Sequence, residues 1–289
     1  MSVQFRDRRF SPIQREHRVI RACIVCDSDR LHHLSSCGPA GLIWRCTVCG
    51  GAHTQQRIQV EAESTYDASY FDGFNRYNDR EAELQKHFGE LLDLVKDRHP
   101  SGSLLDVGCG TGLLLTVART RGYTVQGIEF SAYASHFARE HHALKVTTGT
   151  ISSAATSMNE RFDVITLNHV LEHLEDPRAD LITLRGLLAP GGTLVIGVPN
   201  FASAFRLVLG SRWPSLLPLE HLWHFTPDSL TSLLKECGLM SVEIIAGDNH
   251  AYDTKLPGAL RWIWPGINAL TRSRLRSDSI VTLASLLPI

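Results

Sequence analysis

From Ser103 onward, the chain alternates between short apolar runs and longer segments whose apolar residues recur at helical spacing. The apolar runs predict seven strands, at SLLDVG, TVQGIEF, LKVTTG, RFDVITLNH, TLVIGVP, SVEIIAG and DSIVTLASL. Helices are predicted between them, at residues 113–121, 131–142, 177–188 and 226–237. Strands that alternate with helices indicate an α/β fold with a parallel sheet that is covered on both faces.

Local signals mark two boundaries in this pattern. Thr226 followed by Pro227 is a typical helix start, and Gly238 lies just past the end of the same helix. The Pro-Gly-Gly stretch at 190–192 predicts a turn into the fifth strand. Two insertions interrupt the alternation, at residues 200–225, called the roof insertion below, and at residues 252–277.

The residues before Ser103 follow a different pattern. Short strands are predicted at GLIWRC and HTQQRIQV, in a cysteine-containing stretch too small to have a core of its own. A polar and aromatic connector follows, and residues 81–98 have apolar residues at helical spacing. We therefore expect three parts: an N-terminal module (1–60), a connector with an entrance helix (61–100) and one α/β domain (101–289).

Composition and charge narrow the class of protein. The 289 residues are 43% hydrophobic and 20% charged, which is ordinary for a soluble globular chain. No apolar run is long enough to cross a bilayer, and the N-terminus lacks the apolar core of a secretory signal, so a cytoplasmic protein is expected. The net charge is +5 for residues 1–60, +4 for residues 255–289 and −10 between them. A basic N-terminal module could contact nucleic acid, but the acidic middle argues against a nucleic-acid footprint over the whole molecule.

Four of the seven cysteines form two Cys-x-x-Cys pairs, Cys23 with Cys26 and Cys46 with Cys49. In a reducing compartment this spacing favours a metal over disulfides, and four thiolates are a typical tetrahedral set for structural zinc. The pattern therefore predicts a zinc ribbon, whereas buried or redox-active thiol pairs are the alternative.

The glycine-rich stretch LLDVGCGTG predicts a turn that brings bare backbone close to a ligand. Gly112 is followed by Leu113 and not by lysine, which argues against a nucleoside-triphosphate loop. The glycines are spaced G-x-G-x-G, unlike the usual dinucleotide fingerprint. Asp106 would repel a pyrophosphate but attract an ammonium or sulfonium group. With Glu129 placed to bind ribose hydroxyls, the pocket is suited to S-adenosylmethionine, SAM.

Five stretches together resemble class I SAM-dependent methyltransferases, above all a bacterial group with an N-terminal cysteine-rich ribbon. They are LLDVGCGTG, GIEFS, FDVITLNHVLEHLEDP, LLAPGGTLVIGVPN and EHLWHFTPDSLTSLLKECG. The resemblance implies a Rossmann-like sheet of seven strands whose last strand is antiparallel, with SAM at the carboxyl ends of the strands.

The resemblance also implies which residues contact SAM. By motif match, they are Asp106, Gly108, Cys109, Gly110 and Gly112 at the methionine portion, Glu129 at the ribose, Phe130 at the adenine, and Asn168 and His169 beside the methyl group. Many members place an aspartate after the third strand, where this chain has Thr150 and Ile151, so adenine contact there is expected from the backbone and Thr150. Tyr66, Tyr70 and Phe71 resemble an aromatic entrance that closes over SAM, or they pack the ribbon against the domain.

Histidines are the candidates for proton transfer, because their ordinary pKa lies near neutrality. His169 follows the fourth strand and faces the expected cleft, while His221 and His224 lie on the roof insertion. One of the three is expected to accept the proton of the acceptor, and the alternative for His221 and His224 is a bracing role. A metal site built from His221 and His224 lacks a clear third ligand in the sequence.

The function expected from these features is methyl transfer from SAM to a small molecule, most simply O-methylation of a sugar or secondary metabolite. Two alternatives stay open: an RNA methyltransferase that grips RNA with its ribbon, and a non-catalytic SAM-binding assembly protein. The apolar roof residues line an acceptor pocket or form the contact of a homodimer; they are Trp213, Leu216, Leu217, Leu219 and Trp223. The acceptor and the oligomeric state cannot be read from the sequence.

Overall fold

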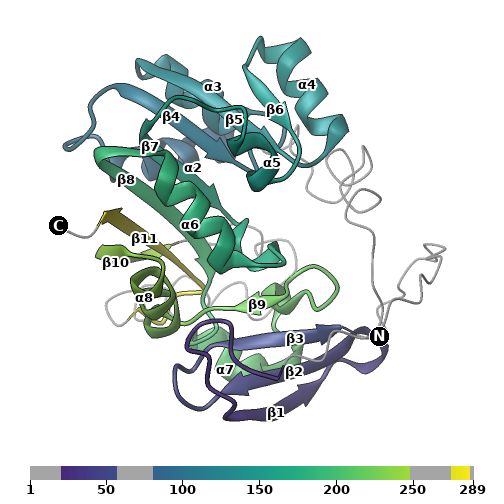
Figure 1. Ribbon diagram of the computed structural model, residues 1–289. Coiled ribbons are helices and arrows are strands. Elements are labelled where there is room, and N and C mark those ends of the chain that lie inside the picture. Colours follow the sequence, from purple (N-terminus) through teal and green to yellow (C-terminus); the bar gives the residue numbers. More distant parts are fainter. Residues whose placement is uncertain (1–20, 57–80, 248–274, 287–289) are drawn as a thin grey trace.

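A seven-stranded sheet forms the centre of the computed structural model, which describes residues 21–56, 81–247 and 275–286 (Figure 1). Its strand order is β10-β11-β8-β7-β4-β5-β6. The strands are β4 (Gly102–Val107), β5 (Tyr123–Glu129), β6 (Val146–Thr148), β7 (Phe162–Asn168), β8 (Leu188–Pro199), β10 (Leu239–Gly247) and β11 (Ser279–Leu286). β11 is antiparallel to both of its neighbours, β8 and β10, which confirms the predicted architecture.

Helices cover both faces of the sheet. The main ones are α2 (Glu81–Asp93), α3 (Leu113–Thr120), α4 (Ala132–His142), α5 (Ile151–Ala155), α6 (Pro177–Leu187) and α8 (Pro227–Glu236). Residues of α5, α6 and α8 share one buried cluster with the sheet, and residues of α2, α3 and α4 share another. The two clusters exist because successive strand residues face opposite sides, so that Leu104 packs in one and Leu105 in the other.

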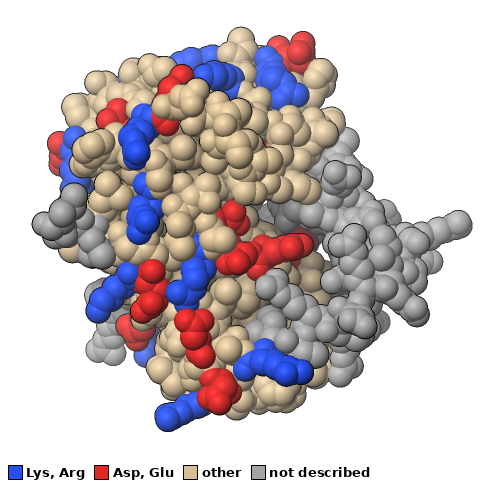
Figure 2. Space-filling view, in the orientation of Figure 1, with Lys and Arg blue, Asp and Glu red and all other residues tan. Residues whose placement is uncertain are grey.

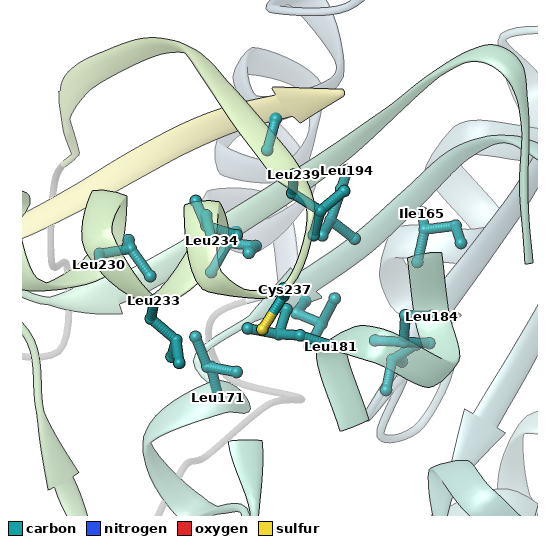
Figure 3. Packing of buried hydrophobic residues seen from close by; sticks show 14 of the residues in the cluster. Ile165, Leu171, Leu181, Leu184, Leu194, Leu230, Leu233, Leu234, Cys237 and Leu239 are labelled. Carbon is teal, nitrogen blue, oxygen red and sulfur yellow. The ribbon is translucent and has the colours of Figure 1, made fainter. Parts of the chain in front are cut away.

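The packing of α8 on α6 shows why the capped helix is fixed in place (Figure 3). Thr226 and Ser229 form a reciprocal capping box, and Pro227 begins the helix, as expected. Leu230, Leu233 and Leu234 of α8 lie in one cluster with Leu181 and Leu184 of α6, and all five are fully buried. The cap and the apolar stripe therefore specify the same helix.

The predicted turn at residues 190–192 is wrong in part, because β8 begins at Leu188 and includes these residues. The pairing of β7 with β8 changes register between Phe162 and Val164, so the Pro-Gly-Gly stretch is an irregularity inside the strand. Gly191 adopts φ +79°, a conformation that favours glycine.

The N-terminal module is a small antiparallel sheet that includes a strand from the roof insertion. Its order is β1-β2-β3-β9, made of β1 (Leu31–Ser36), β2 (Gly41–Cys46), β3 (Ala52–Gln56) and β9 (Trp223–His224). Figure 1 shows this sheet beside α7 (Ala204–Leu209), at the opposite end of the molecule from α4. β1 was not expected from the sequence, and the β3–β9 pairing joins residues that are far apart in the chain.

The ribbon packs into a core that it shares with the rest of the protein. The sequence predicted only that the ribbon is too small to have a core of its own. Ile43 of β2 is fully buried in a cluster with residues of the roof insertion, namely Phe201, Phe205, Trp213 and Leu216. On the other side, the Arg178 guanidinium of α6 donates to the carbonyls of Ile24 (3.0 Å) and Val25 (3.2 Å). Trp213 and Trp223 are thus 2% and 5% exposed and face inward, which leaves little of either for a dimer contact.

Among the described residues, no helix is both long enough and apolar enough to span a membrane. Most of the insertion at 252–277 lies outside the described residues, as do Tyr66, Tyr70 and Phe71.

The shared core leads to a test of cooperativity. Ile43→Ala is expected to lower the free energy of unfolding by about 2–5 kcal/mol in the main transition, because it opens a cavity under the roof insertion. Denaturant unfolding measured by circular dichroism checks this. Leu34→Ala is the matched control, since Leu34 is 36% exposed on β1, and it should cost less than about 1 kcal/mol. A main transition that Ile43→Ala leaves unchanged would show that the ribbon unfolds by itself.

Candidate functional site

The glycine turn between β4 and α3 is built from backbone that only glycine adopts easily. Gly108, Gly110 and Gly112 have φ of +68°, +54° and +88°. A Cβ on Gly108 would lie 2.5 Å from Val170 Cγ2, and one on Gly112 would lie 2.4 Å from Leu144 Cδ1. At Gly108 and Gly112 the turn therefore has neither the conformation nor the space for a side chain. Its N–H groups bond within the protein: those of Gly108 and Cys109 donate to the Ile128 carbonyl at 2.7 and 3.2 Å, and that of Gly110 donates to a side chain.

Glu129 accepts hydrogen bonds from two backbone N–H groups in and after this turn. It ends β5, is 7% exposed, and its Oε2 accepts from the Gly110 N–H at 2.7 Å. Its Oε1 accepts from the Ser131 N–H at 2.7 Å, at the start of α4. Burial raises the pKa of Glu129, and the backbone N–H groups oppose this shift. The carboxylate is thus held in one orientation between the glycine turn and α4.

Asp106 is a second buried carboxylate, at the carboxyl end of the neighbouring strand β4. It is 4% exposed, and its Oδ1 accepts from the Thr166 hydroxyl at 2.6 Å. Burial raises the pKa of Asp106 to about 7; the Thr166 hydrogen bond opposes the shift and the charge of Glu129 adds to it. A cation bound beside Asp106 would favour the ionised form, so this end of the sheet is suited to a positively charged ligand.

The other residues expected at the cofactor lie around the same edge of the sheet. Phe130 follows β5 and is 38% exposed, and half-exposed Asn168 ends β7. Cys109 is buried within the turn. Thr150 caps α5 through its hydroxyl, while the Ile151 side chain packs in the core, so a ligand contact at 151 would come from the backbone. Tyr66 and Phe71 lie outside the described residues.

The four cysteines of the two Cys-x-x-Cys pairs come together in the ribbon. The Sγ atoms of Cys23 and Cys49 are 3.5 Å apart, and those of Cys26 and Cys46 are 3.6 Å apart. All four sulfur atoms lie within 4.8 Å of one another. Zinc–sulfur bonds of about 2.3 Å place the sulfurs of a tetrahedron about 3.8 Å apart, so the cluster fits a zinc ion.

The three candidate histidines lie in different surroundings. His169 follows β7 with φ +58°, and its side chain is 32% exposed. Its Nδ1 is 3.3 Å from Glu172 Oε1. Burial alone would raise the pKa of Glu172, but the surrounding histidines, with the hydrogen bond to His169 first, lower it to about 2. The His169 side chain is therefore partly exposed to solvent, while its hydrogen-bond partner, the Glu172 carboxylate, is buried and ionised.

His221 and His224 are both buried and turned toward protein groups. His221 Nδ1 is 2.8 Å from the Ser215 carbonyl, and burial lowers the pKa of His221 to about 3. His224 Nε2 is 2.8 Å from the Thr54 hydroxyl of β3, and its ring stacks on Phe201. Burial lowers the pKa of His224 as well. His224 thus links the roof insertion to β3, whereas the hydrogen bond of His221 lies within the insertion.

Sequence reasoning missed the convergence around Glu172. This residue lies in η4 (Leu171–His173), is 1% exposed, and contacts His169 and His221 from two different segments. The sequence places Glu172 next to His173, but it gives no signal that the roof insertion folds back onto this turn.

Comparisons with known proteins agree with this geometry. Residues 75–244 match a family described as "Methyltransferase domain". A ubiquinone biosynthesis O-methyltransferase from Cereibacter sphaeroides is 35% identical over 153 residues, which are 48% of this chain and 61% of that protein. One from Ruegeria pomeroyi is 34% identical over 165 residues, or 52% of this chain and 65% of that protein. The matched region is therefore less than two thirds of either relative.

Solved structures share the fold at low sequence identity. Magnesium protoporphyrin IX methyltransferase from Synechocystis PCC 6803, with bound SAH, aligns with TM-score 0.54 at 16% identity over 77% of this chain and 96% of its own. A SAM-dependent methyltransferase from Clostridium acetobutylicum aligns with TM-score 0.52 at 13% identity over 75% of this chain and 99% of its own. Since the family match covers more than half of the sequence and the fold agrees with it, the chain belongs to the class I SAM-dependent methyltransferase family.

Proposed function

We propose that the protein transfers a methyl group from SAM to a small-molecule acceptor, by O-methylation. The observation that carries the proposal is the pair of buried carboxylates, Asp106 and Glu129, beside a glycine turn at the carboxyl ends of β4 and β5. The relatives named above, ubiquinone biosynthesis O-methyltransferases, support transfer to oxygen. A sugar or a secondary metabolite is the acceptor class that we favour.

The site formed by the glycine turn and the two buried carboxylates would hold SAM through opposite charge and complementary shape. Asp106 would attract the cationic methionine portion, Glu129 would accept hydrogen bonds from the ribose hydroxyls, and exposed Phe130 would pack on the adenine. Bound there, SAM would supply an electrophilic methyl group on its sulfonium. Because this chemistry needs an in-line approach of the acceptor, positioning supplies much of the acceleration.

We assign proton acceptance to His169. A hydrogen bond from His169 Nδ1–H to the ionised carboxylate of Glu172 leaves Nε2 to take the proton of an acceptor hydroxyl. Glu172 then acts as a positioning residue, because it orients the imidazole without touching the acceptor. Buried His224, another candidate from the sequence, is assigned to bracing the roof insertion against β3. His221 is also buried, with Nδ1 bonded within the insertion, and we do not assign proton acceptance to it.

Charges of both signs are interspersed on the face drawn in Figure 2. Figure 2 shows Lys and Arg side chains side by side with Asp and Glu in this view, without a large area of one sign. Nucleic-acid binding relies on gathered positive charge.

An acceptor screen tests the activity itself. Protein incubated with methyl-labelled SAM and a panel of sugars and small phenols, with RNA in a parallel reaction, is expected to label a small molecule. Label that enters RNA alone would contradict the proposal and favour the RNA alternative.

With the acceptor found in this way, His169→Gln is expected to lower kcat by about 100-fold or more without changing the KM for SAM. His136→Gln, on the exposed surface of α4, is the matched control; equal kcat for both variants would remove His169 from the chemistry.

Glu129→Gln tests the cofactor site without any acceptor. The amide would present an NH₂ group to one of the two backbone N–H groups that the carboxylate now accepts. We expect the affinity for S-adenosylhomocysteine to fall at least tenfold, or about 1.4 kcal/mol, measured by equilibrium dialysis. Glu140→Gln, on the exposed face of α4, should bind like the wild type. Unchanged affinity in Glu129→Gln would show that the ligand lies elsewhere.

We also propose that the four ribbon cysteines hold a structural zinc ion, since four thiolates fill its coordination shell. Modification of the thiols with an organomercurial is expected to release about one zinc per chain, and to lower the melting temperature because the ribbon loses its cross-link. Zinc release followed with a chromogenic chelator checks this. Cys109→Ala, outside the cluster, should release the same amount. Fully reduced protein that releases no zinc on modification would refute the assignment.

A further inference from the structure

We propose that Glu172, His173 and His221 form a second metal site, which binds a divalent transition-metal ion. One carboxylate oxygen and one ring nitrogen of each histidine lie within 4.8 Å of one another. Glu172 and His173 come from η4, directly after β7, and His221 comes from the roof insertion. This site shares no residue with the cysteine cluster, and two histidines with one carboxylate are a ligand set that zinc, manganese and iron(II) use.

Backbone carbonyls orient both imidazoles for this role. His221 Nδ1 is 2.8 Å from the Ser215 carbonyl, and His173 Nδ1 is 3.1 Å from the Glu220 carbonyl. A carbonyl only accepts hydrogen bonds, so each Nδ1 carries a proton, which makes Nε2 the ring nitrogen that would coordinate a metal ion. Metal-bound histidines typically have their second ring nitrogen fixed by such a carbonyl.

The carboxylate between them lacks a donor for one of its oxygens. Within the described part of the chain, Glu172 Oε2 is buried and has no hydrogen-bond partner. His221 Nε2 lies 4.0 Å from Glu172 Oε1, so two acceptors face each other in a buried space. An unsatisfied buried carboxylate oxygen is costly. A metal ion held between the three residues would accept electron pairs from all of them.

The distances are compatible with coordination after a small adjustment. Bonds of about 2.1 Å span about 3.4 Å between neighbouring ligands of a tetrahedron. The 4.0 Å between His221 Nε2 and Glu172 Oε1 therefore has to shorten by a few tenths of an ångström. The backbone already joins the two segments, because the Leu222 N–H donates to the Glu172 carbonyl at 2.8 Å. The other ligand distances are at most 4.8 Å, so coordination requires side-chain rotations on this frame that bring the atoms closer by up to about 1.4 Å.

Three protein ligands leave at least one coordination position open, unlike the closed shell of four cysteines. The open position would lie beside His169, whose Nδ1 is 3.3 Å from Glu172 Oε1. The metal would thus stand next to the group to which we assign proton acceptance, with a position for water or an acceptor oxygen. The metal site itself rests on the geometry of its ligands, and it holds whether or not the chain methylates a small molecule.

Cobalt binding tests the site without any acceptor. Purified full-length protein, with its cysteine-bound zinc in place, is dialysed against Co²⁺, and both metals are then measured in the protein. We expect zinc and cobalt together to reach about two equivalents per chain. Cobalt in the second site should give the weak visible absorption of nitrogen and oxygen ligands, without the intense near-ultraviolet band of thiolate coordination. A total of one equivalent, or cobalt that always shows the thiolate band, would overturn the proposal.

Substitutions locate the second equivalent. Glu172→Gln and His221→Gln are expected to lower the total from two equivalents to one and to leave the cysteine-bound metal unchanged. His173→Gln, at a half-exposed position, gives the same result with less disturbance of the core. His224→Gln is the matched control: it is buried in the same insertion but bonded to Thr54, so it should keep both equivalents. Melting temperature and S-adenosylhomocysteine binding establish that each variant is folded. Two equivalents in folded Glu172→Gln would refute the assignment.

Discussion

The pairing of β3 with β9 is the interaction on which the acceptor side of the molecule depends. It brings Ala52 opposite His224 and His53 opposite Trp223, residues that are far apart in the chain. The Thr54 N–H donates to the Leu222 carbonyl at 2.9 Å, and the Leu222 N–H donates to the Glu172 carbonyl at 2.8 Å. The roof insertion is thus held between the ribbon and the turn after β7. The ribbon therefore fixes a segment that lies next to the candidate catalytic residue His169.

The residues that we propose for the cofactor site come mainly from one continuous stretch of the chain. Asp106, the glycine turn, Glu129 and Ser131 all fall within 26 consecutive residues. The backbone N–H groups of Gly110 and Ser131 each donate to Glu129 at 2.7 Å. Parallel pairing of β4 with β5 brings the two carboxylates to the same edge of the sheet. This half of the site needs no contribution from the ribbon. A change in the ribbon is accordingly expected to affect the acceptor side and to spare cofactor binding.

This contrast explains how much the sequence could predict. The glycine spacing, the Thr226 cap and the alternation of strands and helices are local signals, and the fold class, the capped helix and the sheet that they predict are present. The antiparallel last strand came from the family resemblance, and it is also present. β9, two residues long, has no recognisable pattern of its own, because it is a strand only where β3 lies beside it. Trp213 is buried by contacts with the ribbon and with Asp278. These contacts are non-local, so the sequence around Trp213 does not predict its burial. The convergence of Glu172 with His221 is non-local in the same way.

The same distinction separates what identifies the family from what decides the acceptor. The buried carboxylates and the glycine turn are the residues that we propose for the cofactor, whereas Glu172, the partner of His169, also meets His221 of the roof insertion through a long-range contact. The most direct test of the cofactor class is calorimetric titration of the purified chain with S-adenosylhomocysteine, with NAD in a parallel run. We expect micromolar binding of S-adenosylhomocysteine and no binding of NAD. Binding of NAD, or of neither ligand, would contradict the assignment of this site to SAM.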